Sequence, residues 1–267
     1  MTQPFIHLRA KSAYSLLQSA LHVEDLAELC VKNQMPAMAL CDANNLFGAL
    51  EFSEYFTSKG VQPIVGCALD VTGEEGLKGT LALLAQNEAG YSNLMQLSSA
   101  AFLEVGAHEE PHVSLERVLE LSEGLIALTG GGDGPLTHLI EAEHRDGAKA
   151  LLQQLAKAFD NRLYVELQRH GLTHEANTEG ALVDLAYELG LPLVATNDVR
   201  FEGRKDYQSH DALMCIAASS YLGEEDRPRV TTEHYFKSGV EMARAFSDLP
   251  EAIANSAEIA RRCAFRA

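Results

Sequence analysis

The stretch LVDLAYELGLPLVAT, residues 182–196, combines a helix, a helix stop and a strand. Its apolar residues Leu182, Leu185, Ala186 and Leu189 recur at the spacing of one helix face. Gly190 and then Pro192 end that helix, because glycine accepts the left-handed turn after a helix and proline cannot continue it. The apolar run Leu193–Thr196 follows directly. The stretch therefore predicts an amphipathic helix that leads into a buried strand.

The same alternation recurs along the whole chain. Two further helical stripes are formed by Val23, Leu26, Ala27 and Cys30, and by Ala148, Leu151, Leu152 and Leu155. Strands that are apolar nearly throughout, separated by amphipathic helices, indicate a parallel sheet covered on both faces. If these strands close on each other, they form an α/β barrel of roughly seven or eight strands with functional residues at their carboxyl ends. The predicted strands are Pro4–Leu8, Ala37–Cys41, Gln62–Val65, Thr80–Ala85, Leu125–Leu128, Leu163–Leu167 and Leu193–Thr196.

Length and composition favour one folded domain over residues 1–267. The hydrophobic content of 46% is ample for a buried core. We find no internal repeat and no Gly/Ser-rich linker that would divide the chain. Two polar segments, Gly106–Pro111 and Gly223–Arg229, are predicted loops, and their carboxylates are expected to form a solvated face.

Charge and cysteine usage narrow the function classes. The formal net charge of -17 would repel a polyanion over most of the surface, so we expect this part to bind DNA weakly at best. The five cysteines are scattered, without the close pairs that build zinc knuckles or redox motifs. No apolar run is long enough to cross a bilayer, and Met1–Leu8 has no signal-peptide pattern. We expect a cytoplasmic protein.

Distinctive residues follow each predicted strand. They occupy the segments His7–Ser15, Cys41–Phe52, Pro63–Cys67, Leu83–Leu94 and Ala195–Arg200. In this order and at these spacings, the set resembles the PHP (polymerase and histidinol phosphatase) domain of bacterial DNA polymerase III alpha subunits, from about residue 4 to residue 263. The resemblance implies a distorted seven-stranded (β/α) barrel of PHP type. It also implies that the chain is the N-terminal fragment of a longer DNA-directed DNA polymerase subunit.

The resemblance further implies a site, and this sequence departs from it. Active members hold up to three divalent metals with His, Asp, Glu and Cys side chains, and these metals activate water against a phosphoester. Here Asp198 of the last motif and the second-motif aspartate Asp42 are retained, and the other donors are replaced. Arg9 and Lys11 occupy the positions of the two first-motif histidines, and Gln18 occupies that of the next aspartate. The later donor positions are occupied by Ala43, Ala68, Thr80, Gly131 and Arg200.

These ten positions therefore predict a vestigial cleft without a metal cofactor and without catalytic residues. Because a buried carboxylate that has lost its metal needs another cation, we expect Arg9, Lys11 and Arg200 to pair with Asp198 and Asp42. The implied role is structural. Its partners would be the remainder of the polymerase alpha subunit and the proofreading exonuclease subunit.

Two other functions stay open at this point. A residual metal-dependent phosphoesterase or 3'-5' exonuclease would need donors from new positions, such as His7, His170, His174 or the pair His210-Asp211. A phosphate or pyrophosphate-binding cleft would use Arg9, Lys11 and Arg200 together. The glycine-rich segment Thr129–Gly134 lacks the Lys-Ser/Thr of a phosphate-binding P-loop and is expected to be a turn between a strand and a helix.

Overall fold

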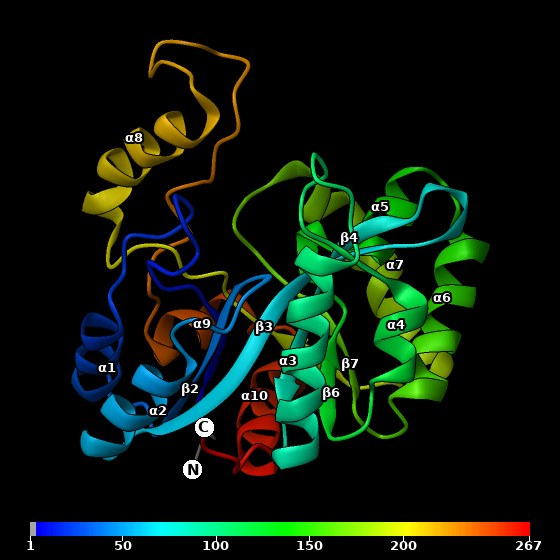
Figure 1. Cartoon of the computed structure of the whole chain (residues 1–267), viewed down its shortest axis with the longest axis horizontal. Helices are drawn as coiled ribbons and strands as arrows, with labels where there is room; N and C mark the ends of the chain where they lie inside the picture. The colour runs from blue at the N-terminus through cyan, green and yellow to red at the C-terminus, as the bar shows by residue number, and fades with distance from the viewer. Residues whose placement is uncertain (1–3) are drawn as a thin grey trace.

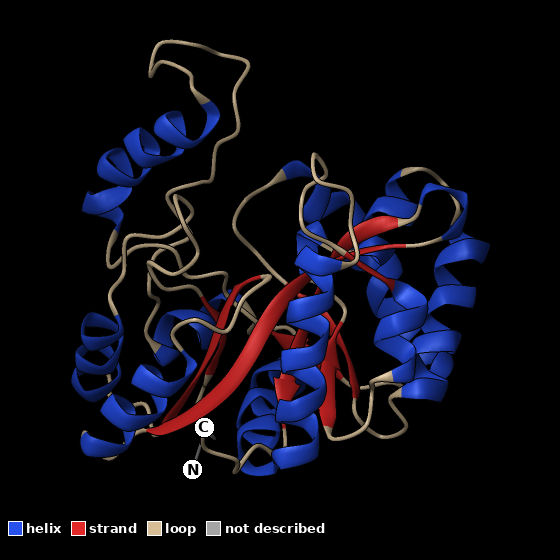
Figure 2. Ribbon diagram, viewed as in Figure 1, coloured by secondary structure: helices blue, strands red, loops and turns tan. Residues whose placement is uncertain are grey.

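The computed structural model describes residues 4–267, and over this range eight strands form one strongly curled sheet (Figures 1 and 2). The strands follow the order β1-β2-β3-β4-β6-β7-β8, with β5 paired to β3 off this path. The predicted α/β class and the seven-stranded path are confirmed. The strands are β1 (His7–Ala10), β2 (Ala37–Ala43), β3 (Gln62–Thr72), β4 (Lys78–Ala85), β5 (Val113–Ser114), β6 (Leu125–Leu128), β7 (Leu163–Leu167) and β8 (Leu193–Ala195).

The expectation of an all-parallel sheet is wrong at β4. This strand is antiparallel to both of its neighbours, β3 and β6, whereas every other pairing in the sheet is parallel. The reason is that β3 runs on to Thr72, well beyond the predicted end at Val65. Only Gly73–Leu77 then joins it to β4, and a parallel return needs a crossover of about a dozen residues or more. The two-residue strand β5 was not predicted.

Both faces of the sheet are buried, which explains the nearly continuous apolar runs. Alternate residues point to opposite faces. One face packs with Ala257, Ile259 and Ala260 of α10, and the other packs with helices that include α1, α2, α3, α6 and α7. The helices are α1 (Val23–Lys32), α2 (Ala49–Ser58), α3 (Glu88–Leu103), α4 (Leu115–Glu120), α5 (Pro135–Glu141), α6 (Arg145–Ala158), α7 (Thr173–Leu189), α8 (Tyr207–Ala218), α9 (Gly239–Ala245) and α10 (Pro250–Arg262).

The predicted helices and loops are present. All three apolar stripes lie on helices (α1, α6 and α7) and supply buried residues, and Gly190 ends α7 with a left-handed φ of 65°. Gly106–Pro111 and Gly223–Arg229 are loops with exposed carboxylates. Together with the loop after it, α8 projects beyond the rest of the fold (Figure 1). Within residues 4–267, no helix is long and apolar enough to cross a membrane.

The two edge strands of the curled sheet, β1 and β8, meet just beyond their carboxyl ends. Ala10 forms an isolated parallel bridge with Val199. The Lys11 amide donates to the Val199 carbonyl over 3.0 Å, and the Val199 amide donates to the Arg9 carbonyl over 3.2 Å. This contact brings the residues that follow β1 beside those that follow β8. It therefore assembles the candidate site.

Candidate functional site

Asp198 lies at the centre of the candidate site, with a cation on each carboxylate oxygen. Lys11 Nζ is 2.8 Å from Oδ1, and Arg200 Nε is 2.8 Å from Oδ2. Lys11 and Asp198 are buried, and the Arg200 side chain is 11% exposed. The predicted pairing of Lys11 and Arg200 with Asp198 is therefore present in the structure.

The pKa values in this pair follow from burial and from the neighbouring charges. Burial alone would raise the pKa of the Asp198 carboxyl, but the charges of Arg200, Lys11 and Arg9 hold it well below its usual value. Burial lowers the pKa of Lys11, and the charge of Arg200 lowers it further, against the attraction of Asp198. Asp198 is therefore a carboxylate throughout the neutral range.

Arg9 does not pair with Asp198 or Asp42 as expected. Its Nη1 contacts Glu166 Oε2 over 3.3 Å, and both side chains are almost fully buried. Glu166 lies in β7 and also accepts hydrogen bonds from Thr196 Oγ1 and, over 2.9 Å, from the Gly130 amide. Burial alone would lower the pKa of Arg9, but the charge of Glu166 raises it above its ordinary value. The partner was missed because Glu166 lies inside an apolar strand and not after it.

Among the described residues, none places a cation on the Asp42 carboxylate, which corrects the second half of the predicted pairing. Its Oδ1 accepts from the Ser12 amide over 2.7 Å and from Ser15 Oγ over 2.6 Å, and its Oδ2 accepts from Ser12 Oγ over 2.7 Å. Burial raises the pKa of Asp42, and these hydrogen bonds from serine oppose the rise. Local donors from the loop after β1 thus satisfy this carboxylate.

The remaining positions of the predicted cleft have separate local roles. The Gln18 carbonyl contacts His210 Nε2 over 2.8 Å, and the Ala43 amide donates to Ser15 Oγ over 3.1 Å. Ala68 is buried in the sheet, while Thr80 Oγ1 donates to Asp70 Oδ1 over 2.6 Å. Gly131 has a φ of 57°, and a Cβ there would meet the Gln168 side chain at 2.5 Å. These contacts involve none of Arg9, Lys11, Asp198 and Arg200.

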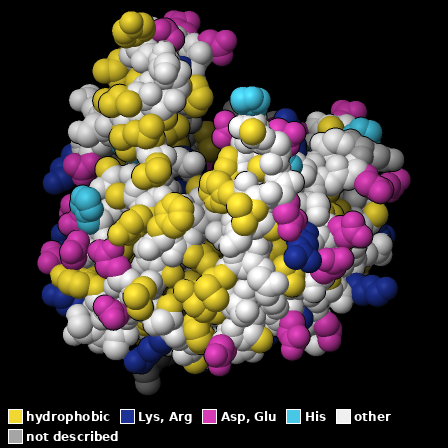
Figure 3. Space-filling model, viewed as in Figure 1, with side chains coloured by type: hydrophobic (Ala, Val, Ile, Leu, Met, Phe, Trp, Pro, Cys, Tyr) yellow, Lys and Arg dark blue, Asp and Glu magenta, His cyan; other side chains and the backbone are white. Residues whose placement is uncertain are grey.

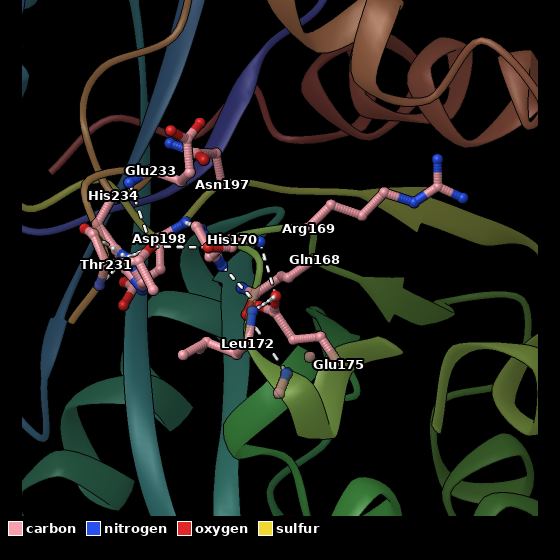
Figure 4. Close-up of polar contacts among 12 residues, drawn as sticks. Gln168, Arg169, His170, Leu172, Glu175, Asn197, Asp198, Thr231, Glu233 and His234 are labelled. Carbon is pink, nitrogen blue, oxygen red and sulfur yellow. Dashed lines mark hydrogen bonds and ion pairs between the residues drawn. The ribbon is translucent and has the colours of Figure 1, made fainter. Parts of the chain in front are cut away.

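A second buried polar group, which includes His170 and His234, adjoins Asp198 (Figure 4). The Asp198 amide donates to His170 Nε2 over 3.2 Å, so His170 donates from Nδ1 to Glu175 Oε1, 2.7 Å away. The His234 ring stacks on the His170 ring with centroids 3.9 Å apart. Burial and the neighbouring His170 lower the pKa of His234 to about 2. This group orients the backbone that carries Asp198.

The histidines weighed as relocated metal ligands are dispersed. His7 Nε2 contacts the Lys237 carbonyl over 2.8 Å, and Asp211 is held by Arg227 through two contacts of 2.6 Å. His174 Nε2 is buried and finds no hydrogen-bond partner in the part of the chain that the structure describes. Across the described residues, no three His, Cys, Asp or Glu side chains form a group that could hold a metal ion.

Comparison with known proteins shows the family of this chain. The family model of the PHP domain matches residues 7–170. The chain belongs to the PHP domain family. It is also 50% identical to a DNA polymerase III subunit alpha of Caulobacter vibrioides and 40% identical to that of Rickettsia felis, over 98% and 100% of this chain. This PHP domain corresponds to the N-terminal part of such subunits.

The chain spans about a quarter of these relatives, 24% of the first and 22% of the second. Among solved structures, an amidohydrolase from Chromobacterium violaceum is 13% identical with a TM-score of 0.49, and the match covers 78% of this chain and 96% of that one.

The side chains of this PHP domain do not fit the metal centre that active members are expected to hold. Both oxygens of Asp198 already contact cations, and both oxygens of Asp42 accept from serine. Arg9, Lys11 and Arg200 would place positive charge against an incoming divalent ion. The three cations pair with Asp198 and Glu166, and serine donors satisfy Asp42, so the chemistry of the site is that of buried ion pairs and hydrogen bonds.

Proposed function

We propose that this chain is a catalytically silent PHP domain of a bacterial DNA polymerase III alpha subunit. The observation that carries the proposal is the double contact on Asp198, where Lys11 and Arg200 take both oxygens. A metal ion would have to displace two buried ion pairs to reach this carboxylate. The site is thus a former metal cleft that is now held together by ionic contacts.

The role that we assign to the domain is structural. It would stabilise the rest of the alpha subunit and offer a docking surface to the proofreading exonuclease subunit. We take residues 1–267 as one domain, of which Met1–Gln3 lie outside the described residues. Polymerase chemistry and the DNA contacts would belong to other parts of the subunit, and the subunit would act in the cytoplasm, where bacteria replicate their chromosomes.

A phosphate or pyrophosphate-binding cleft is the second candidate, and one observation favours it. The buried Nε of Arg9 has no hydrogen-bond partner within residues 4–267. Against it, Arg9, Lys11 and Arg200 all contact carboxylates, so the site has little positive charge left for an anion. Calorimetric titration with inorganic phosphate and with pyrophosphate tests this alternative, and we expect no heat of binding.

Metal analysis tests the first proposal. The purified protein, refolded or dialysed against zinc, manganese or iron, is expected to retain none of these metals stoichiometrically. Its melting temperature is expected to be the same with and without EDTA, since no folding free energy comes from metal. One or more metals per chain, together with a melting temperature that chelation lowers, would contradict the proposal and favour a residual phosphoesterase.

A further inference from the structure

Two stripes of exposed apolar side chains lie on α2 and α3. Met95 and Phe102 on α3 are 43% and 49% exposed, and together with Tyr91 they recur at helical spacing along one side of that helix. Phe47 just before α2 and Leu50 in its first turn are 67% and 58% exposed and lie three residues apart. Side chains this large are normally buried, and contiguous exposed apolar surface marks contact sites.

The two stripes are neighbours on the surface. Ser98, on the same side of α3 as Met95 and Phe102, donates from Oγ to the Asn44 carbonyl over 3.0 Å. Asn44 begins the loop that carries Phe47. Figure 3 shows hydrophobic side chains gathered over the face between α2 and α3. We call Phe47, Leu50, Met95 and Phe102 the α2–α3 apolar strip.

The last residues of the chain lie at one end of this strip. The Phe265 ring packs against Tyr91, one turn before Met95, with ring centroids 5.0 Å apart. The Ala267 amide donates to Ser53 Oγ over 3.2 Å, and Ser53 lies one turn after Leu50 on α2. The last residues of the chain therefore lie between the two helices, beside Tyr91 at the start of the α3 stripe and one turn beyond Leu50 in the α2 stripe.

We propose that the α2–α3 apolar strip is covered, in the longer polymerase chain, by the polypeptide that follows Ala267. The inference rests on the proposed function only in taking the chain as part of a longer subunit, and the match to 24% and 22% of the relatives' lengths supports this. The covering segment would carry aliphatic or aromatic side chains, which match Leu, Met and Phe.

A tethered segment is favoured over other occupants for a physical reason. A segment that starts at Ala267 closes only a short loop when it lies along the strip, so its loop-closure entropy cost is small. A second copy or a separate protein would lose translational and rotational entropy on binding, for the same apolar contacts. The position of Ala267 beside both stripes therefore selects the chain itself as the occupant.

Thiol labelling of single-cysteine positions tests this inference. Leu50→Cys and Phe102→Cys report on the strip, and Val240→Cys, at a residue 71% exposed in α9, is the matched control. The five cysteines of residues 1–267 are buried. Labelling is read at each introduced cysteine by peptide mass spectrometry, so that other cysteines of the longer chain do not enter the rates. Each variant is made in the longer polymerase chain and in the 267-residue chain, and unchanged melting temperatures establish that the variants fold.

We expect labelling at positions 50 and 102 to be about tenfold slower in the longer chain than in the shorter one, with little change at position 240. Equal rates in the two chains at positions 50 and 102 would overturn the inference. Protection that disappears on dilution would indicate a second copy, and protection only after another protein is added would indicate a separate partner; either result also overturns it. Metal binding does not enter this measurement, so the labelling result and the silent-site proposal can fail independently.

Discussion

The ammonium group of Lys11 lies 2.8 Å from Oδ1 of Asp198, in a place where each of the two side chains is 4% exposed. Arg200 contacts the other oxygen of the same carboxylate. One aspartate therefore neutralises two cations that come from opposite edges of the sheet, and it ties the end of β1 to the segment after β8.

Replacing Asp198 should destabilise the fold. Asp198→Ala would leave the buried Lys11 without its partner and would free Arg200, and a stranded buried charge commonly costs about 3 to 5 kcal/mol. Urea unfolding followed by circular dichroism measures the change. Asp226→Ala in an exposed loop is the control, with an expected effect within about 0.5 kcal/mol. If both variants unfold like the parent, the ion pairs do not stabilise the fold.

Arg9 and Glu166 should behave as a coupled pair. Arg9→Met leaves Glu166 buried without its cation, and Glu166→Gln leaves Arg9 without its anion, so each single change should cost about 3 to 5 kcal/mol. The double variant removes both charges and should cost less than the sum of the two single changes. A double-mutant cycle from urea unfolding gives the coupling energy. If the two single changes add up to the effect of the double variant, the 3.3 Å contact contributes no coupling energy.

Stability should fall as the pH is lowered below neutrality, before carboxylates titrate. The pKa of His234 is lowered from 6.5 to about 2 by burial and by His170, and the pKa of His7 is lowered to about 4, mainly by burial. Below pH 6.5 the unfolded chain binds protons that the folded chain does not, so each histidine removes up to about 1.4 kcal/mol per pH unit.

Unfolding free energies between pH 6.5 and pH 5 test this dependence. His234→Gln should make the slope shallower without abolishing it, since burial also lowers the pKa values of His7 and His210 in the folded state. His108→Gln, at an exposed loop position, is the control for the substitution itself. A slope that is the same in His234→Gln and in the parent would mean that His234 is readily protonated in the folded chain.

The isolated domain should bind DNA weakly. Its formal net charge of -17 opposes a polyanion, and its cleft cations are already paired with carboxylates. Fluorescence anisotropy with single-stranded and duplex DNA at physiological salt is expected to show no binding at micromolar protein. Submicromolar affinity that weakens steeply with salt would reveal a local basic patch that overrides the net charge.

Sequence patterns located most of the architecture because buried strands and amphipathic helices leave periodic signals. Leu125–Leu128 and Leu163–Leu167 were predicted with the bounds that the structure has. The direction of β4 was not predictable from its own residues, because an apolar run has the same pattern in either direction. The direction of β4 is set by the length of the segment that joins it to β3. That segment is short because β3 extends to Thr72, which was not predicted.

The candidate site was predicted in part for a similar reason. Residues after strands were found by position, and Lys11, Asp198 and Arg200 do come together. Glu166 was overlooked because it lies within β7, although an ionisable residue in an apolar strand was itself a signal that a buried partner was needed. The serines around Asp42 compete for its oxygens through local hydrogen bonds, which charge matching alone does not anticipate.

The return of β4 beside β3 through the short connection Gly73–Leu77 has a consequence for engineering. Gly73, Glu74 and Gly76 are exposed, and the connection joins two strands whose pairing is fixed on both sides. A fluorophore-binding tag or an epitope inserted within Glu74–Gly76 would extend a surface hairpin without shifting strand register. The insertion site is separate from the buried ion pairs and from the chain end at Ala267. This hairpin is therefore a suitable position for a tag that serves to image or immobilise the protein.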